Sequence, residues 1–321
     1  MRIDVHGHYT ARPFYEALEA LPGVTVERRA AGVHFLKRNG SNWLPFWDRM
    51  FDPDELLRDM DAKQIDRRIL SLSTPSIYEF PPEARIALCR AENDRIIARI
   101  AADPDRLSAV VTLPLPDVEA ALAELERVRT APGVVGLSLG SNLDGVPLSD
   151  TRLEPLWARL NELRFPVVEH PMVPTFAGAM DEFALGVRVG FLYDTSLAMA
   201  RLIYAGVFER YPDFPFVVAH TGAAFVDLLE RLDNGYRNYA DCRAHITQLP
   251  SMFAKRFWYD TCSFYPPFIE MVGGIVGWDR ILFGTDYPFV DLGAEHVTAL
   301  NIDDVTRAAV LGGNAQKLWA F

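Results

Sequence analysis

The sequence contains little cysteine and no long apolar run, and each shortage excludes a class of protein. Its three cysteines, Cys89, Cys242 and Cys262, are scattered, and none has CxxC spacing. This pattern argues against a disulfide framework or a thiolate metal site, and it favours a reducing, cytoplasmic setting. No apolar run reaches the roughly 18 residues that a membrane-spanning helix needs, and no secretory leader precedes the first strand pattern. We therefore expect a cytoplasmic protein without a membrane partner.

Basic charge is also in short supply, since the formal net charge is −11. Proteins that bind nucleic acid are usually basic, so we expect a small-molecule partner and no nucleic acid. An anionic substrate would then need arginines placed close to it, because the overall field repels anions.

Apolar, β-branched segments recur along the chain and alternate with helix-length stretches. The runs of this kind span residues 2–6, 67–73, 107–114, 133–140, 165–171, 215–220, 257–263 and 280–288. Continuous apolar runs indicate strands that are buried on both faces. Eight such strands alternating with helices predict a (β/α)₈ TIM barrel in the α/β class. A doubly wound sheet is the alternative, but no glycine-rich turn follows the first strand.

Helical periodicity marks the stretches between these strands. We predict helices over residues 52–64, 117–129, 153–164, 196–212 and 304–319, the first of them opened by Asp52 and Pro53. Residues 23–50 do not fit the alternation and contain two short β-like pieces around Ala30–Gly32, with a possible turn at Asn39–Gly40. We therefore expect a single domain over residues 1–321, with a small β-containing insertion over about 23–50.

Polar residues with metal-binding side chains stand where several predicted strands end. They are His6, His8, His170, His220, Asp260 and Asp286, and they include four of the seven histidines. Because the carboxyl ends of barrel strands meet at one face, these side chains should converge there. For each residue alone, a structural role such as a strand-end cap or a turn aspartate is the alternative.

The spacing of His6 and His8 places both imidazoles on one side of the first strand, since residues i and i+2 of a strand point the same way. A third imidazole from His170 and the carboxylate of Asp286 complete a nitrogen-rich donor set with one anionic oxygen. This set suits one divalent metal ion, zinc first, with manganese or iron also accommodated. An open coordination position would make the site catalytic.

Four motifs, HGH, EHP, AHTGA and FGTDYPF, occur in the order found in the amidohydrolase superfamily. Over nearly the whole chain the sequence resembles the amidohydrolase-2 group around aminocarboxymuconate semialdehyde decarboxylase (ACMSD). The resemblance implies that His6, His8, His170 and Asp286 bind the metal and that His220 is the acid/base. A protonated Asp286 is a second candidate acid, and Asp260 could simply orient a neighbour or satisfy backbone groups.

The resemblance also implies residues that contact a carboxylic acid substrate. Arg231 falls where the family has a carboxylate-binding arginine, although an ion pair on a helix surface is the alternative. The family has a further arginine at a position where this sequence has Trp47, and the nearest arginine, Arg49, lies two residues further along. Family members with tryptophan and phenylalanine here, as at Trp47 and Phe46, act on aromatic acids. These three residues could instead belong to a core or an interface, and Tyr9 is a fifth candidate.

These features predict a metal-dependent, non-oxidative decarboxylase, a carboxy-lyase that acts on an aromatic or unsaturated carboxylic acid. The alternative is a metal-dependent hydrolase of an amide, lactone or β-diketone bond, because hydrolysis needs the same metal and base. A metal-stabilised binding module without activity is a third reading. The acidic surface and the apolar insertion also suggest a homodimer, because members of the family that the sequence resembles commonly pair through this face.

Overall fold

A closed ring of parallel strands forms the centre of the computed structural model, which describes all residues except 39–40, 176–177, 179 and 181. Neighbouring strands pair in chain order: β1 (Ile3–His8), β5 (Arg67–Ser71), β6 (Leu107–Val111), β7 (Val134–Gly140), β10 (Val167–His170), β11 (Phe216–Val218), β12 (Trp258–Asp260) and β13 (Ile281–Leu282). The Val5 N–H donates to the carbonyl of Phe283 over 2.9 Å, which joins the last strand to the first. The predicted (β/α)₈ barrel is confirmed, and the doubly wound alternative was wrong.

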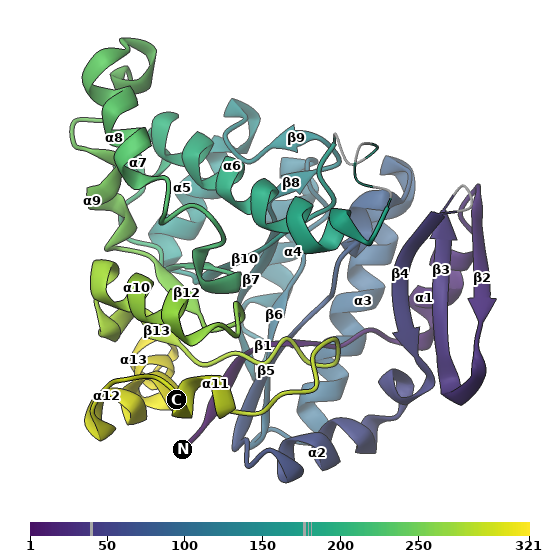
Figure 1. The fold of residues 1–321 in the computed structure, drawn as a ribbon. Helices are drawn as coiled ribbons and strands as arrows, with labels where there is room; N and C mark the ends of the chain where they lie inside the picture. The colour runs from purple at the N-terminus through teal and green to yellow at the C-terminus, as the bar shows by residue number, and fades with distance from the viewer. Residues whose placement is uncertain (39–40, 176–177, 179, 181) are drawn as a thin grey trace.

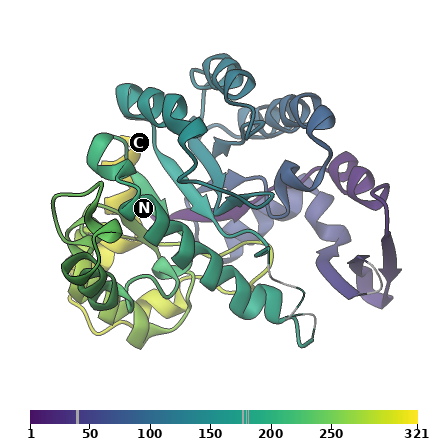
Figure 2. The same cartoon turned by 90° about the horizontal axis from the view of Figure 1, so that it is seen from above.

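Helices surround this ring (Figures 1 and 2). They are α1 (Arg12–Glu19), α2 (Pro53–Ala62), α3 (Pro82–Ala102), α4 (Val118–Val128), α5 (Glu154–Leu163), α6 (Phe191–Tyr204), α7 (Val207–Arg210), α8 (Leu229–Asn238), α9 (Pro250–Ala254), α10 (Pro266–Val276), α11 (Glu295–Thr298), α12 (Asp304–Ala308) and α13 (Asn314–Trp319). In the part of the chain that the structure describes, none of them combines the length and the apolar character needed to cross a membrane.

Alternate residues of the strands fill two separate cores, which explains the continuous apolar runs. Ile3, Val5, Ile69, Val110 and Val217 pack together in one cluster, within the ring of strands. Residues next to them in sequence, such as Leu70 and Val218, belong to the larger cluster shared with the helices. Both faces of each strand are therefore buried, as in a barrel wrapped by helices.

Two predicted helices are interrupted. The helix predicted over 196–212 is divided into α6 and α7 at Gly206, which has φ 71°. A Cβ at this position would lie 2.3 Å from the carbonyl oxygen of His245, so only glycine fits the turn. The helix predicted over 304–319 contains a π-helical turn, Ala309–Gly313, between α12 and α13. Apolar periodicity continues across both interruptions, and so it could not reveal them.

The insertion forms a three-stranded antiparallel sheet beside the barrel (Figure 1). Its strands are β2 (Val24–Arg28), β3 (Val33–Arg38) and β4 (Ser41–Trp47). A separate, smaller hairpin, outside the insertion, pairs β8 (Asn142–Leu143) with β9 (Val146–Pro147). Ala30–Gly32 is a 3₁₀ turn that joins β2 to β3, with the β-like pieces on either side of it. The predicted turn at Asn39–Gly40 lies outside the described residues. The last residue of β4, Trp47, brings the sheet close to the barrel opening.

Candidate metal centre

Four histidines and one aspartate converge at the carboxyl ends of the barrel strands. His6 and His8 come from β1, His170 ends β10, His220 follows β11 and Asp286 follows β13. The ring centroids of His6, His8 and His170 lie 4.9–5.1 Å from one another. The His220 ring lies 5.2 Å from His6 and 5.5 Å from His170. The predicted convergence of these side chains is thus present in the fold.

The donor atoms of the cluster face one another across a short gap. The Nε2 atoms of His6 and His8 are 3.2 Å apart, and Oδ1 of Asp286 lies 3.6 Å and 3.3 Å from them. One donor atom each from His6, His170, His220 and Asp286 also lies within 4.8 Å of the other three. Such mutual closeness of nitrogen and carboxylate donors fits a single divalent metal ion.

Three of the four imidazoles are held by a hydrogen bond at Nδ1. His6 Nδ1 lies 2.6 Å from Oδ2 of Asp260, and His8 Nδ1 lies 2.9 Å from the Ser71 hydroxyl. His170 Nδ1 lies 3.0 Å from the hydroxyl of Thr74, whose own proton goes to the Pro171 carbonyl over 2.7 Å. Because that hydroxyl can only accept from His170, the Nδ1 of His170 carries the proton and its Nε2 lone pair is free for a metal.

His220 differs from the other three histidines. Its Nδ1 is buried, and no hydrogen-bond partner for it is found among the described residues. The residue has φ 53° and opens a 3₁₀ turn, η7 (His220–Gly222). His220 therefore has no hydrogen bond that fixes its ring at Nδ1, and its backbone lies in the uncommon left-handed region. These features suit a histidine that transfers protons better than one that binds a metal ion.

Burial and nearby charge set the protonation states of the cluster. Burial lowers the pKa of His8, of His220 and, most strongly, of His170, where the neighbouring histidines add to the effect. Burial alone would lower the pKa of His6 too, but the hydrogen bond to Asp260 and the charge of that carboxylate raise it to about 9. Burial opposes ionisation of Asp286, yet the bond from His8 and the nearby histidines lower its pKa. Neutral imidazoles and an ionised carboxylate are the forms that bind metal, so of the four expected ligands only His6 has to lose a proton when metal binds.

A second carboxylate, Asp4, fixes the segment that carries Asp286. Its oxygens accept from the backbone N–H of Thr285 (3.0 Å) and from the Thr285 hydroxyl (2.6 Å). They also accept from Nε of Arg68 over 2.6 Å, and Arg68 donates to Asp59 over 2.9 Å. The side chains of Asp4 and Arg68 are fully buried. A Cβ at position 7 would lie 2.7 Å from the Arg68 side chain, which explains the glycine between the two histidines.

Replacement of Arg68 with methionine is expected to destabilise the fold by about 3–5 kcal/mol, because it leaves the buried Asp4 carboxylate without its cation. Urea unfolding followed by circular dichroism measures this loss. Arg58→Met is the control, since Arg58 pairs with Asp52 on the surface, and it should leave the midpoint nearly unchanged. Equal midpoints for the two variants would contradict a structural role for the buried pair.

The predicted substrate residues of the insertion occupy three different environments. Trp47 is half-buried, and its ring lies 6.1 Å from Phe289, whose ring lies 5.5 Å from His8. Phe46 points into the core of the insertion, where its ring lies 4.8 Å from Tyr15. Arg49 is exposed, with its guanidinium 5.8 Å from the Trp47 ring. Of these three residues, Trp47 is thus the one that ring contacts link, through Phe289, to the histidine cluster at the strand ends.

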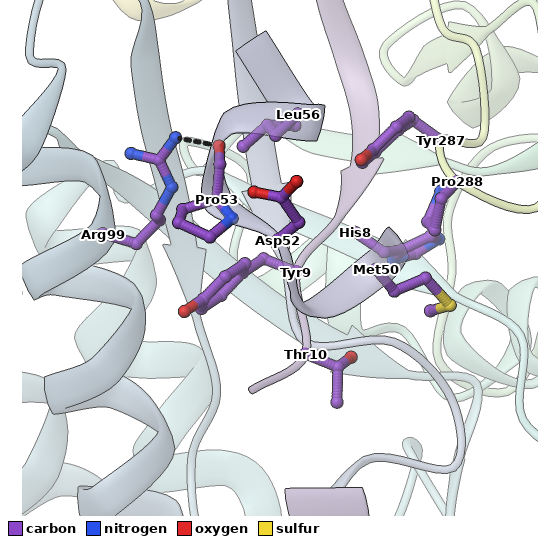
Figure 3. Close-up of a pocket in the computed structure, with 10 residues that line it drawn as sticks. All are labelled: His8, Tyr9, Thr10, Met50, Asp52, Pro53, Leu56, Arg99, Tyr287 and Pro288. Carbon is purple, nitrogen blue, oxygen red and sulfur yellow. Dashed lines mark hydrogen bonds between the residues drawn. The ribbon is translucent and has the colours of Figure 1, made fainter. Parts of the chain in front are cut away.

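The remaining two predicted substrate residues, Arg231 and Tyr9, lie in different parts of the fold. Arg231 is exposed on α8, and among the described residues no hydrogen bond or ion pair connects it to the histidine cluster. Tyr9 is half-buried and lines a small pocket together with His8 and Arg99 (Figure 3). The guanidinium of Arg99 donates to the Pro53 carbonyl over 3.1 Å and to Asp103 over 2.6 Å.

Several side chains at the site were not singled out from the sequence. They are Ser71 and Thr74, which hold two histidines, Arg99, and the rings of Phe289 and Phe191, the latter 6.3 Å from His170. Phe289 belongs to the FGTDYPF motif, and Ser71 and Thr74 belong to a strand end, so their positions offered a signal. Arg99 and Phe191 lie on helices whose facing residues could not be read without the fold.

Comparison with known proteins identifies relatives over the whole length of the chain. A family model described as Amidohydrolase matches residues 3–321. The chain is 28% identical to 2-amino-3-carboxymuconate-6-semialdehyde decarboxylase of Dictyostelium discoideum, over 98% of this chain and 90% of that protein. It is 30% identical to gamma-resorcylate decarboxylase of Rhizobium sp. (strain MTP-10005), over 87% of this chain and 91% of the relative.

Among solved structures, a dihydroxybenzoic acid decarboxylase from Polaromonas sp. JS666 with bound manganese and the inhibitor 2-nitroresorcinol has a similar fold. The TM-score is 0.80 at 24% identity, and the match covers 99% of this chain and 96% of the other. This likeness supports the barrel architecture independently of the strand pairing.

Proposed function

The chain belongs to the amidohydrolase family, and from that premise we propose that it is a metal-dependent, non-oxidative decarboxylase of an aromatic carboxylic acid. The observation that carries the proposal is the difference between the histidines. His6, His8 and His170 are anchored at Nδ1 next to Asp286, whereas Nδ1 of His220 has no such anchor in the described structure. Relatives over most of the chain are decarboxylases of carboxylated muconate or resorcylate compounds.

In this proposal His6, His8, His170 and Asp286 hold one divalent metal ion. When bound, the metal supplies a Lewis acid that holds a substrate oxygen and stabilises negative charge. His220, once it has taken up a proton from solvent, delivers that proton to the carbon that bears the carboxylate, and the carbon–carboxylate bond then breaks to release carbon dioxide. The electron pair of that bond restores the unsaturation of the ring, and His220 regains a proton from solvent.

The aromatic rings beside the cluster support an aromatic substrate. Phe289 and Trp47 form an aromatic wall next to His8, and the ring of Phe191 lies 6.3 Å from that of His170. Offset or edge contacts between aromatic rings contribute about 0.5–1.5 kcal/mol each beyond the area they bury. An apolar wall also raises the free energy of a carboxylate relative to that of neutral carbon dioxide.

Replacing Phe289 with leucine should raise KM for an aromatic acid about 2–10-fold, the equivalent of one ring contact, with a smaller change in kcat. Steady-state kinetics at saturating metal measures both constants. Phe35→Leu provides the matched control, because Phe35 lies in β3 beneath Arg29, and its KM should stay at the wild-type value. An unchanged KM in the Phe289 variant would contradict the proposed wall.

The experiment that tests the function combines metal analysis with a screen for carbon dioxide release from salicylates, resorcylates and muconate semialdehydes. We expect release from at least one aromatic acid, without incorporation of water-derived ¹⁸O into the organic product. Hydrolysis of an amide, lactone or β-diketone with ¹⁸O in the product would instead establish the alternative hydrolase. Bound metal without turnover on either panel would support a binding module.

Three finer features belong to the same proposal. We propose zinc as the resident metal, because three imidazoles and one carboxylate suit it, although manganese occurs in the Polaromonas structure. We also propose a cytoplasmic homodimer. The three cysteines are free thiols, and two apolar side chains stay exposed near the start of α6, Val189 in the turn before it and Leu192 in its first turn. Metal analysis of protein from unsupplemented cells and light scattering in solution test the metal and the dimer.

A further inference from the structure

Asp260, the last residue of β12, connects two parts of the site through one buried carboxylate. Its exposed fraction is 2%. Oδ2 lies 2.6 Å from Nδ1 of His6, while Oδ1 accepts from the backbone N–H groups of Thr221 and Cys262, each over 2.9 Å. Thr221 directly follows His220 in the chain. One side chain therefore contacts both an expected metal ligand and the turn that presents the expected acid/base.

The His220 turn depends on such support because its backbone is strained. His220, Thr221 and Ala223 have φ of 53°, 58° and 53°, in the left-handed region that residues with a Cβ rarely adopt. A residue with a Cβ in this conformation is strained and persists only where its surroundings fix it. Besides the bond to Asp260, Thr221 exchanges hydrogen bonds with Ser263, at 2.9 Å between hydroxyls and 3.1 Å from the Ser263 N–H.

The protonation of the pair follows from its hydrogen bonds. Oδ1 of Asp260 already accepts two backbone N–H groups, and Oδ2 faces Nδ1 of His6, so the carboxylate serves as an acceptor at both oxygens. An ionised carboxylate can only accept, so His6 must donate from Nδ1, and Nε2, which faces His8 and Asp286, is the nitrogen that remains for a metal ion once its proton is lost. This is the tautomer that a metal ligand requires.

We propose that Asp260 is a positioning residue that fixes the metal-binding tautomer of His6 and at the same time holds the turn that carries His220. The role in metal binding rests on the geometry of His6, and the role in turnover rests on the function proposed above for His220. Asparagine cannot replace Asp260. If its oxygen keeps the two backbone N–H groups, its amide donates to His6 and forces the proton onto Nε2. If the amide is reversed, its NH₂ group faces two N–H donors and the turn loses its acceptor.

The test is the metal affinity of Asp260→Asn, titrated with Zn²⁺ and Mn²⁺ in competition with a chromophoric chelator. We expect affinity to fall 10–100-fold, the usual effect of losing the partner of a metal-bound histidine. Asp233→Asn is the matched control. Asp233 is similarly buried, at 4% exposure, and accepts from the N–H and hydroxyl of Ser251 in α9, outside the histidine cluster. Its metal affinity should stay within about twofold of wild type.

Turnover at saturating metal provides the second readout. Asp260→Asn should lower kcat with little change in KM, because the His220 turn moves while the aromatic wall remains. Should that variant fail to fold by circular dichroism, Asp260→Glu replaces it. Glutamate keeps the charge that sets the His6 tautomer but cannot reach both partners, so metal affinity should fall less than tenfold while kcat still falls.

The outcomes separate this inference from the proposed function. Wild-type metal affinity and kcat in Asp260→Asn, or equal losses in the Asp233→Asn control, would overturn the positioning role even if the wild-type protein decarboxylates aromatic acids. Absence of decarboxylation by the wild-type protein would overturn the proposed function. The metal titration would then still decide whether Asp260 controls His6.

Discussion

Replacing His220 with glutamine is expected to lower kcat for decarboxylation by about 10²–10⁴-fold, the range attributed to a general acid or base. Metal content should stay at the wild-type level. The reason lies in the difference among the four histidines, because His6, His8 and His170 are anchored at Nδ1 and Nδ1 of His220 has no partner in the described structure. Glutamine keeps a polar group in the pocket but cannot deliver a proton at neutral pH.

Metal analysis by mass spectrometry and single-turnover kinetics together measure this result. His34→Gln is the control, since His34 is also buried but lies in the insertion, where its Nε2 pairs with Asp48 over 3.1 Å. The control should keep wild-type kcat. Loss of the metal from His220→Gln would show instead that His220 is a ligand, which the closeness of its ring to His6 and His170 makes a meaningful alternative.

Replacing His8 with alanine should weaken metal binding roughly 100-fold and reduce turnover to background unless metal is added in excess. Four-ligand zinc sites bind with about 10–16 kcal/mol, so one ligand accounts for roughly 3 kcal/mol. His8 is central to the cluster, with its Nε2 3.2 Å from that of His6 and 3.3 Å from Asp286. Equilibrium dialysis against buffered Zn²⁺ measures the affinity.

The corresponding control is His34→Ala, which removes a buried imidazole of the insertion and should leave metal affinity unchanged. If His8→Ala retained both metal and turnover, the assignment of the whole centre would be wrong. If it lost metal but excess Zn²⁺ restored kcat, His8 would serve binding alone. The second pattern is the one that we expect, because His8 contributes no proton in the proposed reaction.

Much of the fold was predictable because a strand that is buried on both faces appears in the sequence as a continuous apolar run. Each of the eight apolar runs overlaps one barrel strand, although β1 continues to His8, two residues beyond its predicted run, and β11, β12 and β13 cover only part of their predicted ranges. The helix at 196–212 was predicted without its break, since the clash at Gly206 involves His245, far away in sequence. Close approaches of this kind leave no periodic signal in one segment.

The candidate site was predictable to the extent that chemistry repeats at strand ends. His6, His8, His170, His220 and Asp286 were found because a barrel must bring such ends together. Phe46 and Trp47 are neighbours in sequence, yet alternation along β4 sends one into the insertion core and the other toward Phe289. Which of the two side chains faces the barrel could not be predicted without knowing which elements pack on each face of β4.

The sequence by itself determined the kind of donor atoms, their order and the barrel that gathers them, because these follow from residue type and from alternation along the chain. The tertiary structure alone decided which histidine stays unanchored. Asp260, Ser71 and Thr74 come from other strand ends and form hydrogen bonds with Nδ1 of His6, His8 and His170 in turn. No described residue forms one with Nδ1 of His220. A hydrogen bond depends on angstrom-scale distances between residues up to 254 positions apart. Only the folded chain sets those distances, and with them the difference among the four histidines on which their proposed roles rest.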